Sequence, residues 1–260
     1  MMRALMKKIN LYSLALNIRE HFRKVTMYRV NQSIRVSLIK KYRQNSTVLP
    51  NYFSGEQLES MKHELRQYIG TPFESYSEAA KKRTFRQVDM FAKNSLLKLF
   101  SNDSILHDIA SYYWGQPIKL ISSFGYRIEP QAPAEYSSYQ WHHDCKRKQL
   151  KVFVLLTDLD EKGQVFQFAP GTHKHVHVFK SYDDSRFTQK DIELMCTPIT
   201  ISGKAGTVFF VDTNGLHKGV RNLSKNRDLW CNLLVPQHFS EAYNKTNTLM
   251  SNGLIDIPLT

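Results

Sequence analysis

A series of short β-rich runs in the second half of the chain is the feature that most limits which fold the protein can adopt. Turn signals such as Pro170-Gly171 and Ser202-Gly203 separate the runs, and few helical segments lie between them. A parallel sheet needs a long crossover between successive strands, so the sequence favours an antiparallel sandwich or barrel in an α+β chain with a mainly β core. The runs are residues 118–128, 151–157, 165–169, 176–179, 197–201, 207–212 and 228–235.

Helices are expected mainly before this β-rich half. Ser54 is placed as an N-cap with Gln57 three residues later, and an apolar stripe that includes Leu58 and Leu65 runs until Gly70 ends the helix. Two further short helices are predicted at residues 96–100 and 105–114.

The positive charge is concentrated at the N-terminus. The formal net charge is +13, and residues 1–44 contain eleven Lys or Arg against one acidic residue, which places +10 of it there. We therefore divide the chain into a basic amphipathic helical extension, residues 1–44, and one domain, residues 45–260. The extension is expected to pack on the domain with its cations solvated; the alternative is peripheral contact with an anionic membrane surface. No nucleic acid partner is expected, because neither stacking aromatics nor a recognition-helix pattern accompanies the charge.

Cysteine usage indicates the compartment. Cys145, Cys196 and Cys231 are odd in number and widely spaced, which matches neither a disulfide framework nor a zinc ribbon. The basic N-terminus also lacks the small-residue cleavage site of a secretory signal. These features favour a reducing, cytoplasmic location.

Metal-binding residue types occur close together at 141–144, which reads Trp-His-His-Asp. In extended chain, residues i and i+2 point to the same face, so His142 and Asp144 project together. His217, just after the apolar run 207–212, is the candidate third ligand on a neighbouring strand. Two imidazoles and one carboxylate on one side of a metal leave three positions open, as in non-haem Fe(II) oxygenases.

Arg227 follows ten residues after His217, at the start of another β-rich run. A guanidinium binds a carboxylate bidentately. Arg227 is therefore a candidate anchor for a dicarboxylate cosubstrate.

Taken together, the motifs in residues 45–235 resemble the phytanoyl-CoA hydroxylase (phytanoyl-CoA dioxygenase) family of Fe(II)/2-oxoglutarate-dependent oxygenases. Besides the metal motif, the likeness rests on Ala169-Pro-Gly-Thr-His173, on Gly206-Thr-Val-Phe-Phe-Val-Asp212 and on His217-Lys-Gly219. The stretch 48–58 also resembles the first strand and helix of that family. The resemblance implies a double-stranded β-helix, a jelly-roll or cupin-like barrel, with flanking helices.

The resemblance also implies roles for individual residues. His142, Asp144 and His217 would ligate Fe(II), and Arg227 would bind the distal carboxylate of 2-oxoglutarate. Tyr126 and Trp141 are further candidates for the cosubstrate pocket. The implied reaction uses O2 to hydroxylate a C–H bond of a small-molecule substrate, with release of succinate and CO2. Because Asp144 is present, the halogenase pattern of related enzymes does not apply.

Two departures from the family pattern keep alternatives open. The interval from His217 to Arg227 is one residue shorter than in close members, which keeps Arg221 as an alternative carboxylate anchor. Lys218 also stands where the family usually has Gly. The rival functions are a cupin-like metalloprotein of another reaction class and a catalytically inactive jelly-roll binding protein.

The pocket rim, with its substrate contacts, is expected to include the segment 70–91 and the loop 180–190. The segment 70–91 contains four cations, which slightly favours an anionic or carrier-linked substrate; the alternative is a solvated basic face. They are Lys81, Lys82, Arg83 and Arg86.

Overall fold

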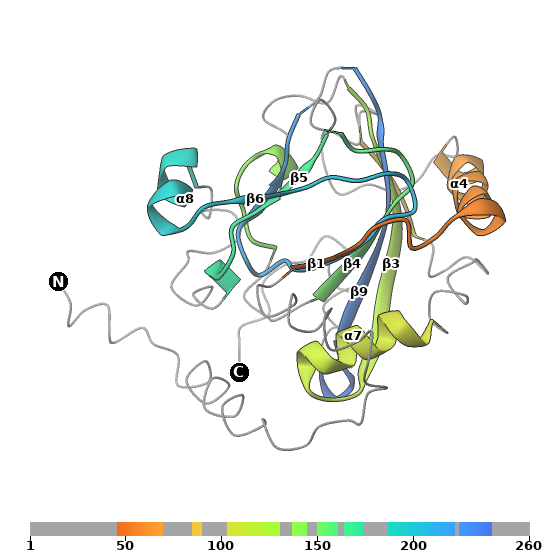
Figure 1. Ribbon diagram of the computed structural model, residues 1–260, viewed down its shortest axis with the longest axis horizontal. Coiled ribbons are helices and arrows are strands. Elements are labelled where there is room, and N and C mark those ends of the chain that lie inside the picture. Colours follow the sequence, from red (N-terminus) through yellow and green to blue (C-terminus); the bar gives the residue numbers. More distant parts are fainter. Residues whose placement is uncertain are drawn as a thin grey trace, which may run out of the picture.

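The computed structural model describes residues 46–69, 85–89, 103–130, 137–144, 150–160, 164–173, 187–221 and 224–240. Within these ranges the chain forms two antiparallel sheets with few helices (Figure 1). The larger sheet has six strands in the order β1-β7-β4-β9-β3-β2, and the smaller has three in the order β6-β5-β8. The larger sheet consists of β1 (Ser46–Leu49), β7 (Val208–Asp212), β4 (Leu150–Leu155), β9 (Arg227–Pro236), β3 (Ile118–Ile128) and β2 (Phe85–Asp89). The smaller consists of β6 (Ile199–Ile201), β5 (Phe166–Phe168) and β8 (His217–Gly219).

The antiparallel, mainly β architecture predicted from the sequence is confirmed. The longest predicted run, Ile118–Ile128, is β3 with the same bounds, and β4, β5, β6, β7 and β9 lie within two residues of their predicted limits. Two short strands, β2 and β8, were not predicted as separate strands.

The core between the two sheets is apolar and rich in aromatic rings. Phe153 of β4 stacks on Phe209 of β7 with ring centroids 4.8 Å apart, and Phe166 of β5 packs against both rings. All three are buried. Burial of these rings fixes the separation of the two sheets, and the space between the sheets holds the functional side chains.

Two helices cover the opposite face of the larger sheet. They are α4 (Gly55–Ile69) and α7 (Ser104–Trp114), both as predicted within a residue or two. In Figure 1, α4 lies on the side away from β5 and β6, and the buried residues of α7 pack in the same cluster as those of α4. Asp103 caps the N-terminus of α7, and Gly115 ends that helix with a positive φ of 62°. The outward residues Val152, Phe210 and Trp230 pack in the same cluster as Leu65 of α4.

A third helix corrects the sequence analysis. Residues 180–190 were predicted as a loop, but Thr188 caps α8 (Gln189–Met195), with a capping box formed with Asp191. Residues 85–89, within the segment 70–91 that was expected at the pocket rim, form β2.

Several predictions fall on residues outside the described ranges. These are the extension 1–44 with its membrane contact, the helix at 96–100, the strand at 176–179 and the four cations of the loop 70–91 as side chains. None of the helices in the described ranges has the length and hydropathy that a bilayer crossing requires. The cytoplasmic location stays a prediction.

Candidate metal centre

The backbone brings His142 and His217 together directly. The two residues form an isolated antiparallel bridge, in which each peptide N–H donates to the carbonyl of the other at 3.1 and 2.9 Å. Their rings lie on the same side of this bridge, with centroids 4.3 Å apart. Residues 75 positions apart are thus aligned by two main-chain hydrogen bonds.

Hydrogen bonds to backbone carbonyls orient both imidazoles. Nδ1 of His142 lies 2.7 Å from the Gln140 carbonyl oxygen, and Nδ1 of His217 lies 2.9 Å from that of Gly215. A carbonyl oxygen can only accept, so each Nδ1 carries the proton and each Nε2 keeps its lone pair. This outer hydrogen bond is the usual support of a metal-ligating histidine.

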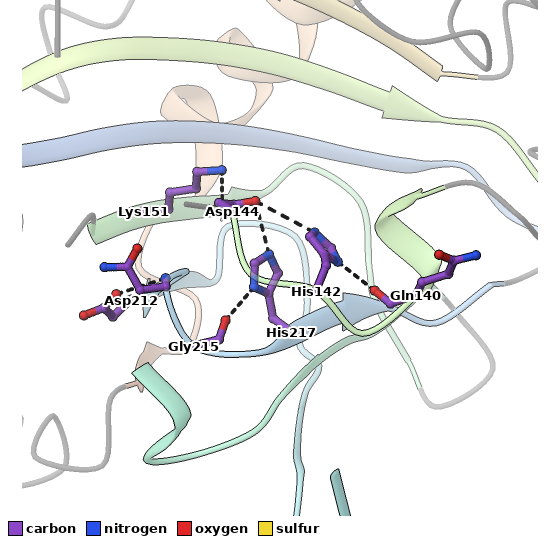
Figure 2. A network of polar contacts seen from close by, with 8 residues as sticks. Gln140, His142, Asp144, Lys151, Asp212, Gly215 and His217 are labelled. Atoms are coloured by element: carbon purple, nitrogen blue, oxygen red, sulfur yellow. Dashed lines mark hydrogen bonds and ion pairs between the residues drawn. The ribbon is translucent and has the colours of Figure 1, made fainter. Parts of the chain in front are cut away.

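Asp144 completes the cluster. Its peptide N–H donates to the Thr213 carbonyl at 3.0 Å. Its Oδ1 lies 3.8 Å from Nε2 of His142 and 3.7 Å from Nε2 of His217, whereas Oδ2 accepts a hydrogen bond from Lys151 Nζ at 2.7 Å (Figure 2). One ligand atom from each of the three residues lies within 4.8 Å of the others, and this is the metal-binding group found in the described part of the chain.

The electrostatics keep these groups ready to bind a cation. Burial opposes ionisation of Asp144, but the charges of Lys151 and the imidazoles and the Lys151 hydrogen bond outweigh it, so the pKa of the carboxyl lies well below 3.8. Burial lowers the pKa of His217 from 6.5, more than the Asp144 carboxylate raises it. At neutral pH the site therefore presents a carboxylate and a neutral His217 imidazole.

The turn that precedes His217 is held by a buried carboxylate that the sequence analysis did not single out. Asp212 accepts the Asn214 peptide N–H at 3.1 Å through Oδ1, and its Oδ2 accepts the hydroxyl of Tyr113 from α7. This turn provides both the Gly215 carbonyl for His217 and the Thr213 carbonyl for Asp144. The sequence signal that could have identified it is an Asp at the end of an otherwise apolar strand. In the structure this Asp is fully buried.

Arg227 is buried close to the metal-binding group. Its side chain is only 4% exposed, and Nη1 donates to the Gln164 carbonyl at 3.0 Å. A Cβ atom at Gly219 would lie 2.6 Å from Nη1, so the guanidinium lies against that glycine. Gly219 and His217 are two residues apart on β8 and share a face. Arg227 therefore lies on the same side of β8 as the His217 ring.

Gln164 and Tyr139 lie near Arg227, and the sequence analysis did not single them out. The Tyr139 hydroxyl donates to Gln164 Oε1 at 3.0 Å, and Gln164 Nε2 donates to the carbonyls of Ile128 and Lys225. Burial raises the pKa of Tyr139, while the charges of Arg227 and Arg221 oppose that change. Arg221 is exposed, in contrast to Arg227, and this difference favours Arg227 as a carboxylate anchor.

The two remaining predicted site residues occupy different surroundings. Tyr126 of β3 packs against the inter-sheet core and shares a side-chain hydrogen bond with Cys231. Burial raises the pKa of the Cys231 thiol to about 12. Trp141 is buried against Ile192 of α8, donates its indole N–H to Gln189 at 2.9 Å and lies under Lys218. The role of either residue in cosubstrate binding stays a prediction.

Comparisons with known proteins place the chain by its fold. No protein-family model and no curated protein sequence matches it.

Solved structures do match the chain. The epimerase SnoN from nogalamycin biosynthesis, described as non-heme alpha-ketoglutarate dependent, is 17% identical, with a TM-score of 0.61 over 78% of this chain and 80% of that one. HygX from Streptomyces hygroscopicus, solved with nickel and 2-oxoglutarate, is 17% identical, with a TM-score of 0.58 over 82% of this chain and 88% of HygX. EctD from S. alaskensis is 16% identical, with a TM-score of 0.61 over 82% of this chain and 81% of EctD. The chain therefore has the fold of these proteins, and it carries two imidazoles and a carboxylate placed to hold one metal ion.

Proposed function

We propose that the protein is an Fe(II)- and 2-oxoglutarate-dependent dioxygenase of the phytanoyl-CoA hydroxylase type. It hydroxylates a C–H bond of a small molecule and releases succinate and CO2. The observation that carries this proposal is that His142, Asp144 and His217 each bring one ligand atom within 4.8 Å of the others. Two imidazole nitrogens and one carboxylate oxygen suit Fe(II), and these three ligands leave coordination positions for other groups.

The residues around the cluster fit such a metal. Gln140 and Gly215 fix the imidazole tautomers, and Lys151 engages the carboxylate oxygen that points away from the histidines. When bound, iron, 2-oxoglutarate and O2 supply the oxidising chemistry. The protein holds the ligands in place and limits access of water through the packed rings of Phe166 and Phe209.

Arg227 fits the distal carboxylate of 2-oxoglutarate. Its guanidinium is buried, it is positioned by Gln164, and Gly219 leaves it room on the His217 side of β8. A buried guanidinium can form two parallel hydrogen bonds with a carboxylate. Tyr126, on the inter-sheet side of β3, is proposed as a contact for the cosubstrate or the substrate.

We further propose that the two sheets form a double-stranded β-helix. The support is the antiparallel pairing, the aromatic core between the sheets and the fold shared with SnoN, HygX and EctD. SnoN was solved with nogalamycin RO and HygX with hygromycin B. A small-molecule substrate for this chain is proposed on that basis.

Anaerobic titration with Fe(II), with and without 2-oxoglutarate, tests the proposal. We expect a visible absorption band of the Fe(II)–2-oxoglutarate chelate only when both are present, and its absence in His217→Ala. Fe(II) binding without this band would favour a cupin-like metalloprotein of another reaction class. Failure to bind Fe(II) would leave a binding protein without catalysis.

A further inference from the structure

Lys151 interrupts the apolar inner face of β4. The next residues on that face, Phe153 and Leu155, belong to the core between the sheets. The cross-strand neighbours of Lys151 are Val211 on β7 and Leu233 on β9. Only 21% of the lysine side chain is exposed. An ammonium group in such surroundings costs free energy unless its charge is paired.

Asp144 provides that pairing. Lys151 Nζ lies 2.7 Å from Oδ2, while both histidine Nε2 atoms approach Oδ1 (Figure 2). Lys151 and the histidines thus contact different oxygens of one carboxylate. In the protein without metal, the ammonium and the carboxylate offset each other's charge.

A divalent cation bound beside Oδ1 would meet Lys151 as a like charge a few ångströms away. In a partly buried site such repulsion is screened much less than in water. An anionic chelator on the metal would relieve this repulsion, because it brings negative charge to the same place.

We propose that Lys151 is a positioning residue that acts as an internal countercation of the metal site. It weakens binding of a divalent metal alone and makes metal binding depend on an anionic chelating cosubstrate. The identity of that cosubstrate, 2-oxoglutarate, rests on the proposed function. The effect on the metal alone does not depend on it.

Titration of the full chain with Mn(II), followed by the loss of the free-ion electron paramagnetic resonance signal, tests this inference without any turnover. The variants are Lys151→Met, which removes both charge and donor, Lys151→Gln, which keeps an N–H donor, and Lys151→Arg, which keeps the charge. Lys204→Met is the matched control, because Lys204 pairs with Asp158 at 2.8 Å but is 76% exposed.

We expect Lys151→Met and Lys151→Gln to bind Mn(II) at least about tenfold more tightly than the parent. Lys151→Arg and Lys204→Met should stay within about threefold of the parent. The factor by which 2-oxoglutarate strengthens Mn(II) binding should fall in the Met and Gln variants. By linkage, the factor by which Mn(II) strengthens 2-oxoglutarate binding should fall equally.

Unchanged or weaker Mn(II) binding in both Lys151→Met and Lys151→Gln, with circular dichroism of the parent type, would overturn the inference. The proposed function would survive that result if the parent still binds Mn(II) and His142→Ala does not. If neither the parent with 2-oxoglutarate nor Lys151→Met binds Mn(II), or if His142→Ala binds it as the parent does, the metal site and the inference both fail.

Discussion

The two faces of the larger sheet are built from the same strands but have different tasks. Along β4, β7 and β9, even-numbered residues such as Val152, Phe210 and Trp230 face α4 and α7. Odd-numbered residues such as Phe153, Phe209 and Leu229 face the smaller sheet, and Lys151 and Arg227 lie on the same face of β4 and β9. The face toward the helices thus contributes mainly packing, with Asp212 as a buried carboxylate that accepts the Tyr113 hydroxyl, whereas the other face combines packing with the cations Lys151 and Arg227. Alternation along each strand allows both, because a side chain on one face does not displace its neighbour on the other.

The largest expected effect concerns the metal-binding group of His142, Asp144 and His217. His142→Ala, Asp144→Ala or His217→Ala should each abolish 2-oxoglutarate turnover, measured as succinate formation, because each removes one of three metal ligands. The apolar face toward α4 and α7 is untouched, so the far-ultraviolet circular dichroism should not change. Succinate formation by any one variant would remove that residue from the ligand set.

Phe209 and Phe210 give a matched pair across the sheet, since both are fully buried on β7. Either change to Ala should lower the free energy of unfolding by about 3–5 kcal/mol, measured by urea denaturation. Only Phe209→Ala should also weaken metal binding per folded molecule, because Phe209 packs on Phe166, which stacks on the His217 ring. Equal metal affinities in the two variants would mean that the faces are not separate in this sense.

Arg227→Ala should weaken the apparent affinity for 2-oxoglutarate by roughly two to three orders of magnitude, since truncating a buried ion pair costs about 3–5 kcal/mol. Fe(II) binding should change little. Arg221→Ala is the control, because Arg221 is exposed. If the two phenotypes were exchanged, Arg221 would be the anchor. If neither variant changed the affinity, the oxygenase proposal would give way to the cupin-like alternative.

A smaller effect is expected from pH. The pKa of His217 is lowered by burial below 6.5, so on acidification the unfolded chain binds a proton before the folded one does. The free energy of unfolding of the metal-free protein should therefore fall as pH drops below about 6.5. His217→Gln should show a shallower dependence over the same range. Identical slopes in the two proteins would show that His217 titrates normally in the folded state.

The sequence predicted elements best where a local pattern is long. The run Ile118–Ile128 combines apolar and aromatic residues over eleven positions, and β3 has those bounds. By contrast, β8 is only three residues long, His217–Gly219, and it forms because β5 and His142 pair with it. No local pattern encodes such a strand. The capping box of α8, Thr188 with Asp191, was present in the sequence and could have been used.

The candidate site divides in the same way. His142 and Asp144 could be paired by their spacing of two, and His217 and Arg227 were candidates from their places beside β-rich runs, with roles that the family resemblance then implied. The contact of Lys151 with Asp144, and those of Gln164 with Tyr139 and Arg227, join residues from different elements and have no characteristic spacing. Tyr113 of α7 reaches Asp212 from 99 positions away. Supporting contacts of this kind depend on the tertiary arrangement.

Gly219, which has no side chain, also bears on the length of the ligand that would fit beside Arg227. The Arg227 guanidinium occupies the space that a Cβ at this position would need. An alanine at position 219 would push the guanidinium toward the metal-binding group or out of its hydrogen bond with Gln164. On the proposed function, residue 219 would act as a spacer that helps to set how long a dicarboxylate fits between the metal and Arg227, and it would be a position for changing which keto acid binds.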